Sequence, residues 1–155
     1  MYKQDLATSL GGRVRFVRFI ISYKDLQLTS GSGAKEIALT DADNPTLTFQ
    51  IPAYGKILGV GLKTTVAFTG GSLSAMTMSL GVHGALTRFT SAYDVFQAVG
   101  DTVLQETSLF KLGQASATAL AVSFTPTGDT CANCTAGSLF LDILFLDVST
   151  AALPA

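Results

Sequence analysis

Apolar and polar residues alternate along several stretches of this chain. In GKILGVGLKTTVAF the even positions from Leu58 to Phe68 are almost all apolar, whereas glycine, lysine and threonine occupy most of the odd positions. A period of two places successive side chains on opposite faces of a β-strand, so this stretch predicts a long, half-buried strand. The same alternation predicts strands at 46–51, 74–82 and 119–124.

Two further stretches depart from simple alternation. In RVRFVRFIIS (13–22) the pattern switches near Val17 and Arg18, which predicts a bulge or a change of environment along one strand. In SLFLDILFLDV (138–148) both faces are apolar, so we expect this strand to be covered twice, within the fold or by a neighbouring subunit. Its two faces are Leu139, Leu141, Ile143 and Phe145 on one side and Phe140, Leu144, Leu146 and Val148 on the other.

Clusters of turn-forming residues separate these strands. Weaker strands at 35–40 and 102–110 bring the total to about eight, the number expected for a jelly roll. We therefore predict an all-β fold, an eight-stranded antiparallel two-sheet jelly-roll sandwich with one short helix in a connection. The helix is placed at TSAYDVFQAVG, between the fifth and sixth strands, with Thr90 as its N-cap and Gly100 at its C-terminal cap.

The length of 155 residues suits one domain. We expect a single β-sandwich domain at 13–149, a C-terminal tail at 150–155 and an N-terminal arm at 1–12. The arm spaces Tyr2, Leu6 and Leu10 four residues apart before two glycines, as expected either of a segment that orders on a partner or of a frayed tail.

Composition favours self-association. Hydrophobic residues make up 48% of the chain and charged residues 14%, well below the roughly 25% that is typical of soluble domains. This predicts that part of the apolar surface is buried against other subunits in a homo-oligomer. The net charge of −1 argues against nucleic acid as a partner. The lack of a signal-peptide pattern and of a long apolar run argues against a membrane partner and for synthesis in a cytosol.

Positive charge is concentrated at the start of the chain. Residues 1–24 contain five basic residues against Asp5 alone, which predicts either docking on an acidic partner or a strand edge protected by charge. The basic residues are Lys3, Arg13, Arg15, Arg18 and Lys24.

Candidate catalytic groups are scarce, so we expect no enzyme, no cofactor and no metal. The one histidine, His83, follows a strand, where a loop histidine without a chemical role is the ordinary case. The DADN sequence at 41–44 begins like a calcium loop, but the position of the bidentate carboxylate is Pro52.

Both cysteines lie in GDTCANCTAG, at C-x-x-C spacing. A structural zinc site needs four ligands, and the chain offers only Cys131, Cys134 and His83. A redox pair normally precedes a helix, whereas a strand is predicted here, and a disulfide would close a very small loop. Reduced loop cysteines are favoured over a disulfide, and a disulfide over a metal site.

Two segments carry a resemblance to a known group of proteins. FQIPAYGKILGVGLKTTVAFTGG, with the strand ending in LGV, and FTPTGDTCANCTAGSLFLDILFLDV resemble a recurring pattern in small virion proteins of tailed bacteriophages, over roughly residues 45–148. The resemblance implies a jelly-roll head decoration or cement protein, which binds the outside of a capsid and stabilises it, without catalytic residues. The residue before TAG is often apolar in such chains, which implies that Cys134 fills a small buried site and that Cys131 is the more exposed thiol.

From this resemblance we expect a non-enzymatic protein on the head surface of a virion, made in the host cytoplasm. Its partners would be the major capsid protein and further copies of itself, with a trimer suited to quasi-threefold lattice positions. Oligomer contacts would bury strand 138–148 and the small-residue face of strand 56–68. Candidates for docking on the capsid are Arg13, Arg15, Arg18 and Lys24, and candidates for the oligomer interface are Leu139, Leu141, Ile143 and Phe145.

Three other functions stay open. A receptor- or carbohydrate-binding module of a tail or head fibre would expose aromatic rings, and the chain has no Trp and four Tyr. A main coat protein of a small virus would need a basic arm to package a genome. An enzyme is disfavoured by the shortage of candidate groups.

Overall fold

The structure is a computed structural model of the whole chain. The residues that it describes are 2–5, 14–27, 33–40, 47–96, 100–103 and 116–147.

The described residues are almost entirely β-structure. In chain order the elements are β1 (Tyr2–Asp5), β2 (Val14–Ser22), α1 (Tyr23–Gln27), β3 (Lys35–Ala38), β4 (Gln50–Ile51), β5 (Lys56–Thr69), β6 (Ala75–Gly81), β7 (Tyr93–Asp94), β8 (Gly100–Val103), β9 (Thr118–Ala119), β10 (Ala121–Thr127), the short 3-10 helix η1 (Cys131–Asn133) and β11 (Ala136–Leu146).

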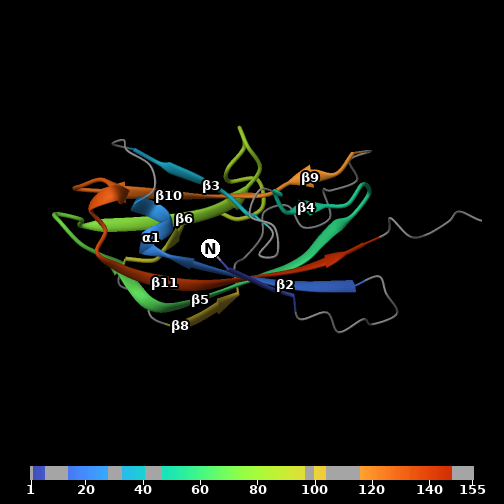
Figure 1. The fold of residues 1–155 in the computed structure, drawn as a ribbon, viewed down its shortest axis with the longest axis horizontal. Helices are drawn as coiled ribbons and strands as arrows, with labels where there is room; N and C mark the ends of the chain where they lie inside the picture. Colours follow the sequence, from blue (N-terminus) through green and yellow to red (C-terminus); the bar gives the residue numbers. More distant parts are fainter. Residues whose placement is uncertain are drawn as a thin grey trace, which may run out of the picture.

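Two antiparallel sheets face each other (Figure 1). One sheet has the order β1-β2-β11-β5-β8 and the other β3-β10-β6-β7, while β4 and β9 form a separate two-stranded sheet at one end. Eight of these strands form four nested antiparallel pairs, in which the first strand along the chain pairs with the last, the second with the second last, and so on. The pairs are β2 with β11, β3 with β10, β5 with β8 and β6 with β7. Successive nested pairs alternate between the two sheets, which is the strand arrangement of a jelly roll.

The predicted all-β sandwich is confirmed, although the eight strands are not the eight predicted. The stretch 46–51 contributes only β4, which lies outside the two main sheets. The strand that completes the set is β7, which lies inside the predicted helix. The strand predicted at 102–110 begins at Gly100, and its later residues lie outside the described part.

The helix predicted at 90–100 is wrong over the residues that the structure describes. Tyr93 pairs with Met78 in the register of β6 and β7, and the Val95 backbone N–H donates to the Met76 carbonyl. The Thr90 hydroxyl accepts a hydrogen bond from the Leu80 N–H at 2.8 Å instead of capping a helix. The helical spacing of Tyr93 and Phe96 was therefore misleading. Pairing with β6 at the edge of the sheet outweighs a weak local preference for helix.

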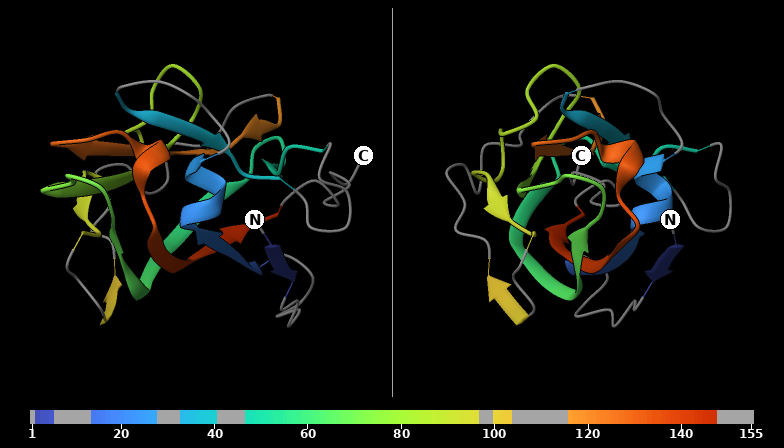
Figure 2. Two further views of the ribbon diagram at one scale, coloured as in Figure 1. Left: turned by 60° about the vertical axis from the view of Figure 1, so that its left-hand side comes forward. Right: turned by 90° about the vertical axis from the view of Figure 1, so that its left-hand side faces the viewer.

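A short helix does occur, but directly after β2. Asp25 of α1 accepts hydrogen bonds from both the backbone N–H and the hydroxyl of Ser22, at 2.8 and 3.1 Å, which closes its first turn. Leu26 is fully buried, so α1 covers one open end of the sandwich, as two further views show (Figure 2).

The bulge predicted near Val17 and Arg18 is also wrong. The pairing of β2 with β11 runs without a shift from Ser22 to Val14. Arg15 has the inward parity but lies at the exposed end of the strand, so its charge does not enter the core. Register shifts occur instead between β11 and β5, on either side of Ser138 and after Leu144. They interrupt the alternation of β5, and Val66 is 48% exposed as a result.

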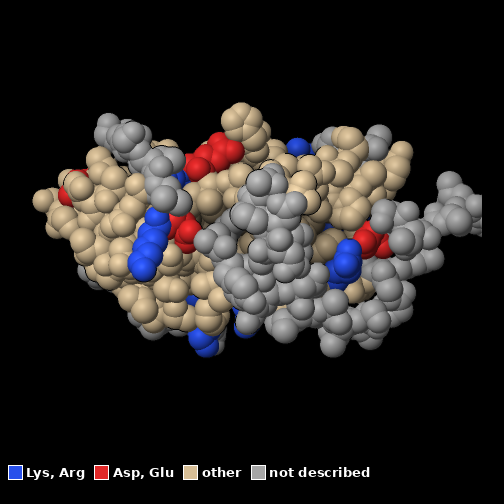
Figure 3. Space-filling view, viewed as in Figure 1, with Lys and Arg blue, Asp and Glu red and all other residues tan. Residues whose placement is uncertain are grey.

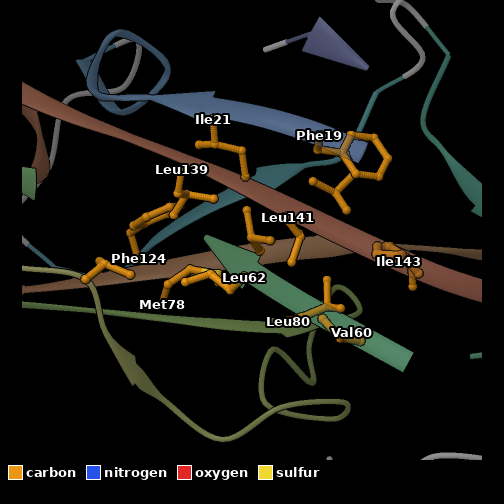
Figure 4. Packing of buried hydrophobic residues seen from close by; sticks show 14 of the residues in the cluster. Phe19, Ile21, Val60, Leu62, Met78, Leu80, Phe124, Leu139, Leu141 and Ile143 are labelled. Carbon is orange, nitrogen blue, oxygen red and sulfur yellow. The ribbon is translucent and has the colours of Figure 1, made fainter. Parts of the chain in front are cut away.

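The core fills the space between the two sheets. Figure 4 shows side chains of β2, β5 and β11 pointing toward those of β6 and β10. Aromatic rings add directional contacts: Phe49 packs edge-on against both Phe19 and Phe145, with centroids 5.2 and 5.7 Å apart. The core residues labelled in the figure are Phe19, Ile21, Val60, Leu62, Met78, Leu80, Phe124, Leu139, Leu141 and Ile143.

The predicted N-terminal arm is described only in part. Tyr2–Asp5 forms β1, which pairs with β2 from Tyr2 opposite Ile20 to Asp5 opposite Val17. The rest of 1–12 and the predicted tail at 150–155 lie outside the described residues. The prediction that the arm orders on a partner therefore stays a prediction.

Candidate functional site

The four predicted docking residues do not form one basic patch. Arg15 lies near the start of β2 and Lys24 in α1, beyond the other end of that strand. Seven residues separate Arg15 from the end of β2 at Ser22, about 23 Å at the rise of a strand. Arg13 lies outside the described residues. Basic side chains likewise lie at separate places on the face shown in Figure 3 and do not gather into one patch there.

Two of these arginines face acidic partners in their own chain. Arg15 lies 3.3 Å from the carboxylate of Asp147, with 48% of its side chain exposed. Arg18 binds both oxygens of Asp142, through Nε at 2.7 Å and Nη2 at 2.8 Å. Lys24 is exposed on α1. Arg18 is therefore largely neutralised within the fold, and Arg15 and Lys24 are the exposed positive charges of the predicted set that the structure describes.

The Arg18–Asp142 pair lies on an aromatic surface. The Arg18 guanidinium carbon is 5.0 Å from the ring centroid of Phe140 and 5.9 Å from that of Phe16. The hydrogen bond to Asp142 raises the pKa of Arg18 above its usual value, which keeps the guanidinium charged. Bidentate pairing and ring contacts hold this guanidinium in one orientation.

The predicted oligomer-interface residues lie in the core of their own chain. Leu139, Leu141 and Ile143 are 0% exposed and Phe145 is 3% exposed. Leu139, Leu141 and Ile143 point toward the opposite sheet (Figure 4), and the Phe145 ring packs against Phe49. These residues are therefore not available to a second subunit, and this assignment is wrong. The strand does have two apolar faces, but the chain itself covers the face that we assigned to the partner.

The opposite side of β11 faces away from the core, and we call the surface around it the outer face. Strict alternation along β2 and β11 places the remaining apolar side chains there, and Leu144 is 37% exposed. From β5 the register adds two glycines and Val66. The outer face consists of Phe16, Arg18 and Ile20 of β2, Phe140, Asp142 and Leu144 of β11, and Gly59, Gly61, Lys63 and Val66 of β5.

The glycines leave open space on the outer face. A Cβ added at Gly59 would come no closer than 3.8 Å to Leu144, and one added at Gly61 no closer than 3.6 Å to Asp142. A shallow groove of about 370 Å³ lies next to the outer face. The two meet at Ser138, which is paired with Ser22 on one side and with Val66 on the other. Its lining is Ser22, Tyr23, Lys24, Val66 and Thr135–Ser138.

Both cysteines are free thiols in a closed environment. Cys131 is 2% exposed and Cys134 0% exposed, so Cys134 fills a buried site as expected, and Cys131 is the more exposed thiol by only a small margin. The Cys134 sulfur lies 3.0 Å from the Ala136 carbonyl and 3.3 Å from the Thr69 carbonyl, so its single S–H can donate to either one. The Gln27 side chain of α1 donates to the Cys134 carbonyl at 2.8 Å. Burial raises the pKa of both thiols, which disfavours the reactive thiolate.

Other candidate groups are dispersed. His83 has a side chain that is 93% exposed and lies 3.0 Å from Glu36. The DADN loop lies outside the described residues. Within the described ranges, no three His, Cys, Asp or Glu side chains gather as a metal site would require. No helix in the described part of the chain has the length and apolarity needed to cross a bilayer.

Sequence reasoning identified two parts of the outer face, the second apolar side of 138–148 and the small-residue face of 56–68, but missed the Arg18–Asp142 pair, for which a signal was present. The even positions from Val14 to Ile20 and from Phe140 to Val148 are apolar apart from one charge in each run, Arg18 and Asp142. Once these strands are known to be neighbours in register, the two charges fall opposite each other.

Comparison with known proteins identifies the fold. One chain of a solved structure described as "Cyanophage Pam1 capsid asymmetric unit" superposes with a TM-score of 0.57, at 16% sequence identity, over 93% of this chain and 93% of that chain. No protein-family model matches the chain, and no curated protein matches it. The similarity to the cyanophage chain covers nearly the full jelly roll.

Proposed function

We propose that this protein is a non-enzymatic phage virion protein of the decoration or cement type, which binds the outer surface of the head and stabilises the shell. The observation that carries the proposal is the end-to-end similarity of the jelly roll to a chain of the cyanophage capsid asymmetric unit, at 93% coverage of both chains. At 16% identity this similarity concerns the fold, so the role on the head is the proposed step.

A protein of this type stabilises a shell by mass action. It binds the assembled lattice and not the dissociated subunits, so the free energy of binding adds to the stability of the lattice. Such a function requires surfaces and no reacting groups.

Docking on the shell would use the exposed charges near the N-terminal strands. Arg15 and Lys24 can meet acidic capsid residues, whereas Arg18 is held by Asp142. Exposed ion pairs contribute about 0.2–1 kcal/mol each, so these two residues would orient the protein more than hold it.

The test is binding of the purified protein to heads of its own phage from which it is missing. We expect co-sedimentation with mature heads, a higher temperature of head disruption, and density for the chain on the outer head surface in cryo-electron microscopy. Free capsid subunits serve as the control, because a cement protein leaves them unbound. Density confined to the tail, or no co-sedimentation, would exclude the decoration role, and glycan binding by a tail-located protein would support the receptor-binding alternative.

A further inference from the structure

The outer face is an apolar sheet surface that the described elements leave without a covering layer. Phe16, Ile20 and Phe140 are half-buried, and Leu144 and Val66 are 37% and 48% exposed. The opposite sheet covers the inner side of the same strands, and α1 covers one end of the sandwich. Contiguous exposed apolar surface of this kind marks an interaction site.

The charges on this face nearly cancel. Arg18 and Asp142 form its central ion pair, with side chains 29% and 24% exposed. A strongly acidic or basic partner would need a large excess of one charge, whereas Arg18, Lys63 and Asp142 leave the outer face with a single excess charge. The partner that matches such a face is itself apolar with a central charge pair.

We propose that the outer face packs against the outer face of a second copy of this chain, around a twofold axis near the Arg18–Asp142 pair. A twofold axis at this point brings Arg18 of one copy toward Asp142 of the other, and the reverse, so the face is complementary to itself. Arg18 has five N–H donors, and Asp142 uses Nε and Nη2, so donors remain for a second carboxylate. The two charge pairs then form a network whose members stay paired when water is excluded.

The size of the face limits the strength of this contact. Nine paired residues along three strands cover roughly 30 by 14 Å, so two copies bury on the order of 800 Å². This area is small for a permanent dimer, so we expect weak, concentration-dependent association in solution. A shell that holds neighbouring copies close together would strengthen the same contact through effective concentration.

This inference goes beyond the proposed function, which concerns binding to the head, and its experiment uses the isolated protein. Arg18→Asp leaves two negative charges at the centre of the face, and Asp142→Arg leaves two positive charges. Each variant alone should be monomeric at concentrations where the natural protein forms dimers by analytical ultracentrifugation. An equimolar mixture of the two variants should regain dimers, and native mass spectrometry should show one copy of each variant in them.

Two matched substitutions, one on the outer face and one elsewhere, test whether a loss of dimers comes from the outer face or from misfolding. Leu144→Glu places a charge on the outer face and should reduce dimerisation at least tenfold. Leu47→Glu changes a residue that is 57% exposed outside the five-stranded sheet and should leave dimerisation unchanged. Circular dichroism and melting temperatures confirm that each variant is folded.

Several outcomes would overturn the inference. These are a natural protein that stays monomeric at every concentration, an assembly of three chains, or dimers that Leu144→Glu leaves intact. A monomer that loses capsid binding on Leu144→Glu would assign the face to the capsid protein. Monomers that still bind heads contradict only the inference, whereas dimers that never bind heads contradict only the proposed function.

Discussion

The two faces of β11 have similar apolar content but differ in burial. On the inner face, Leu139, Leu141 and Ile143 are fully buried between the sheets. On the outer face, Leu144 is 37% exposed and Asp142 is held by Arg18 across the sheet. The hydrophobicity of the strand therefore predicts that both faces are covered. The chain itself covers only the face that lies against the opposite sheet. Substitutions at matched inner and outer positions test this difference.

The largest difference is expected between leucines. Leu141→Ala removes fully buried methyl groups from the core and should lower the free energy of unfolding by about 2–5 kcal/mol. Leu144→Ala should change it by less than about 1 kcal/mol in the monomer. Denaturant unfolding at low protein concentration measures both, and equal losses would contradict the assignment of the two faces. If Leu141→Ala does not fold, Ile143→Val offers a milder test, with a loss of about 0.5–1.5 kcal/mol.

Glycines of the two faces should differ nearly as much. Gly137 has a φ of +144°, and an added Cβ would overlap the Phe68 ring. Gly137→Ala should therefore cost roughly 1–3 kcal/mol through overpacking alone, and more through backbone strain. Gly61→Ala meets only Asp142 Cβ at 3.6 Å and should leave the melting temperature unchanged or slightly higher. A Gly61→Ala variant that melts far below the natural protein would show that the outer face is already covered.

Adjacent threonines of β5 provide an opposite pair of effects. The hydroxyl of Thr64 is buried, at 1% exposure, and has no hydrogen-bond partner in the described part of the chain. Thr64→Val should therefore raise the free energy of unfolding by about 1 kcal/mol. The Thr65 hydroxyl donates to the Ser138 carbonyl at 3.0 Å, so Thr65→Val should lower it by about 0.5–1.5 kcal/mol. Urea unfolding of both variants checks the signs, and a destabilising Thr64→Val would mean that its hydroxyl is satisfied.

The smallest effect concerns the thiols beside the start of β11. Burial raises the pKa of Cys131 and Cys134 in the folded state, so both remain protonated where unfolded thiols ionise. Stability from this source is complete below the unfolded thiol pKa of about 8.5 and is lost as the pH rises above it. Unfolding from pH 7 to 10 should show this decline, and the Cys131→Ala/Cys134→Ala variant should show a smaller one.

Thiol labelling provides a second measurement on the same residues. Both cysteines of the native protein should react far more slowly with a thiol reagent than those of the unfolded chain. Labelling of Cys134 faster than Cys131 in the native protein would contradict the expectation that Cys134 is the more buried thiol.

Much of the fold could be predicted from the sequence because alternation is a local property. The patterns at 56–68, 74–82, 119–124 and 138–148 correspond to β5, β6, β10 and β11. The short strands were harder. β7 is two residues long and is held by its pairing with β6. The spacing of apolar residues around Tyr93 fits a helix, so the local sequence pattern does not reveal this pairing. The burial of Cys134 was inferred from resemblance and agrees with the structure, whereas the near-complete burial of Cys131 depends on the packing of α1 against η1.

The sequence by itself determined that this chain forms a β-sandwich rich in strands with two apolar faces, since residue periodicity sets which side chains share a face. Only the tertiary structure decided which face became core, because burial depends on which sheet lies opposite. It also decided which of the predicted docking charges are paired within the chain. Arg18 and Asp142 are 124 residues apart in the chain, and the pairing of β2 with β11 brings them within 2.7 Å. Such a pair depends on strand register, which local sequence does not specify across so long a separation.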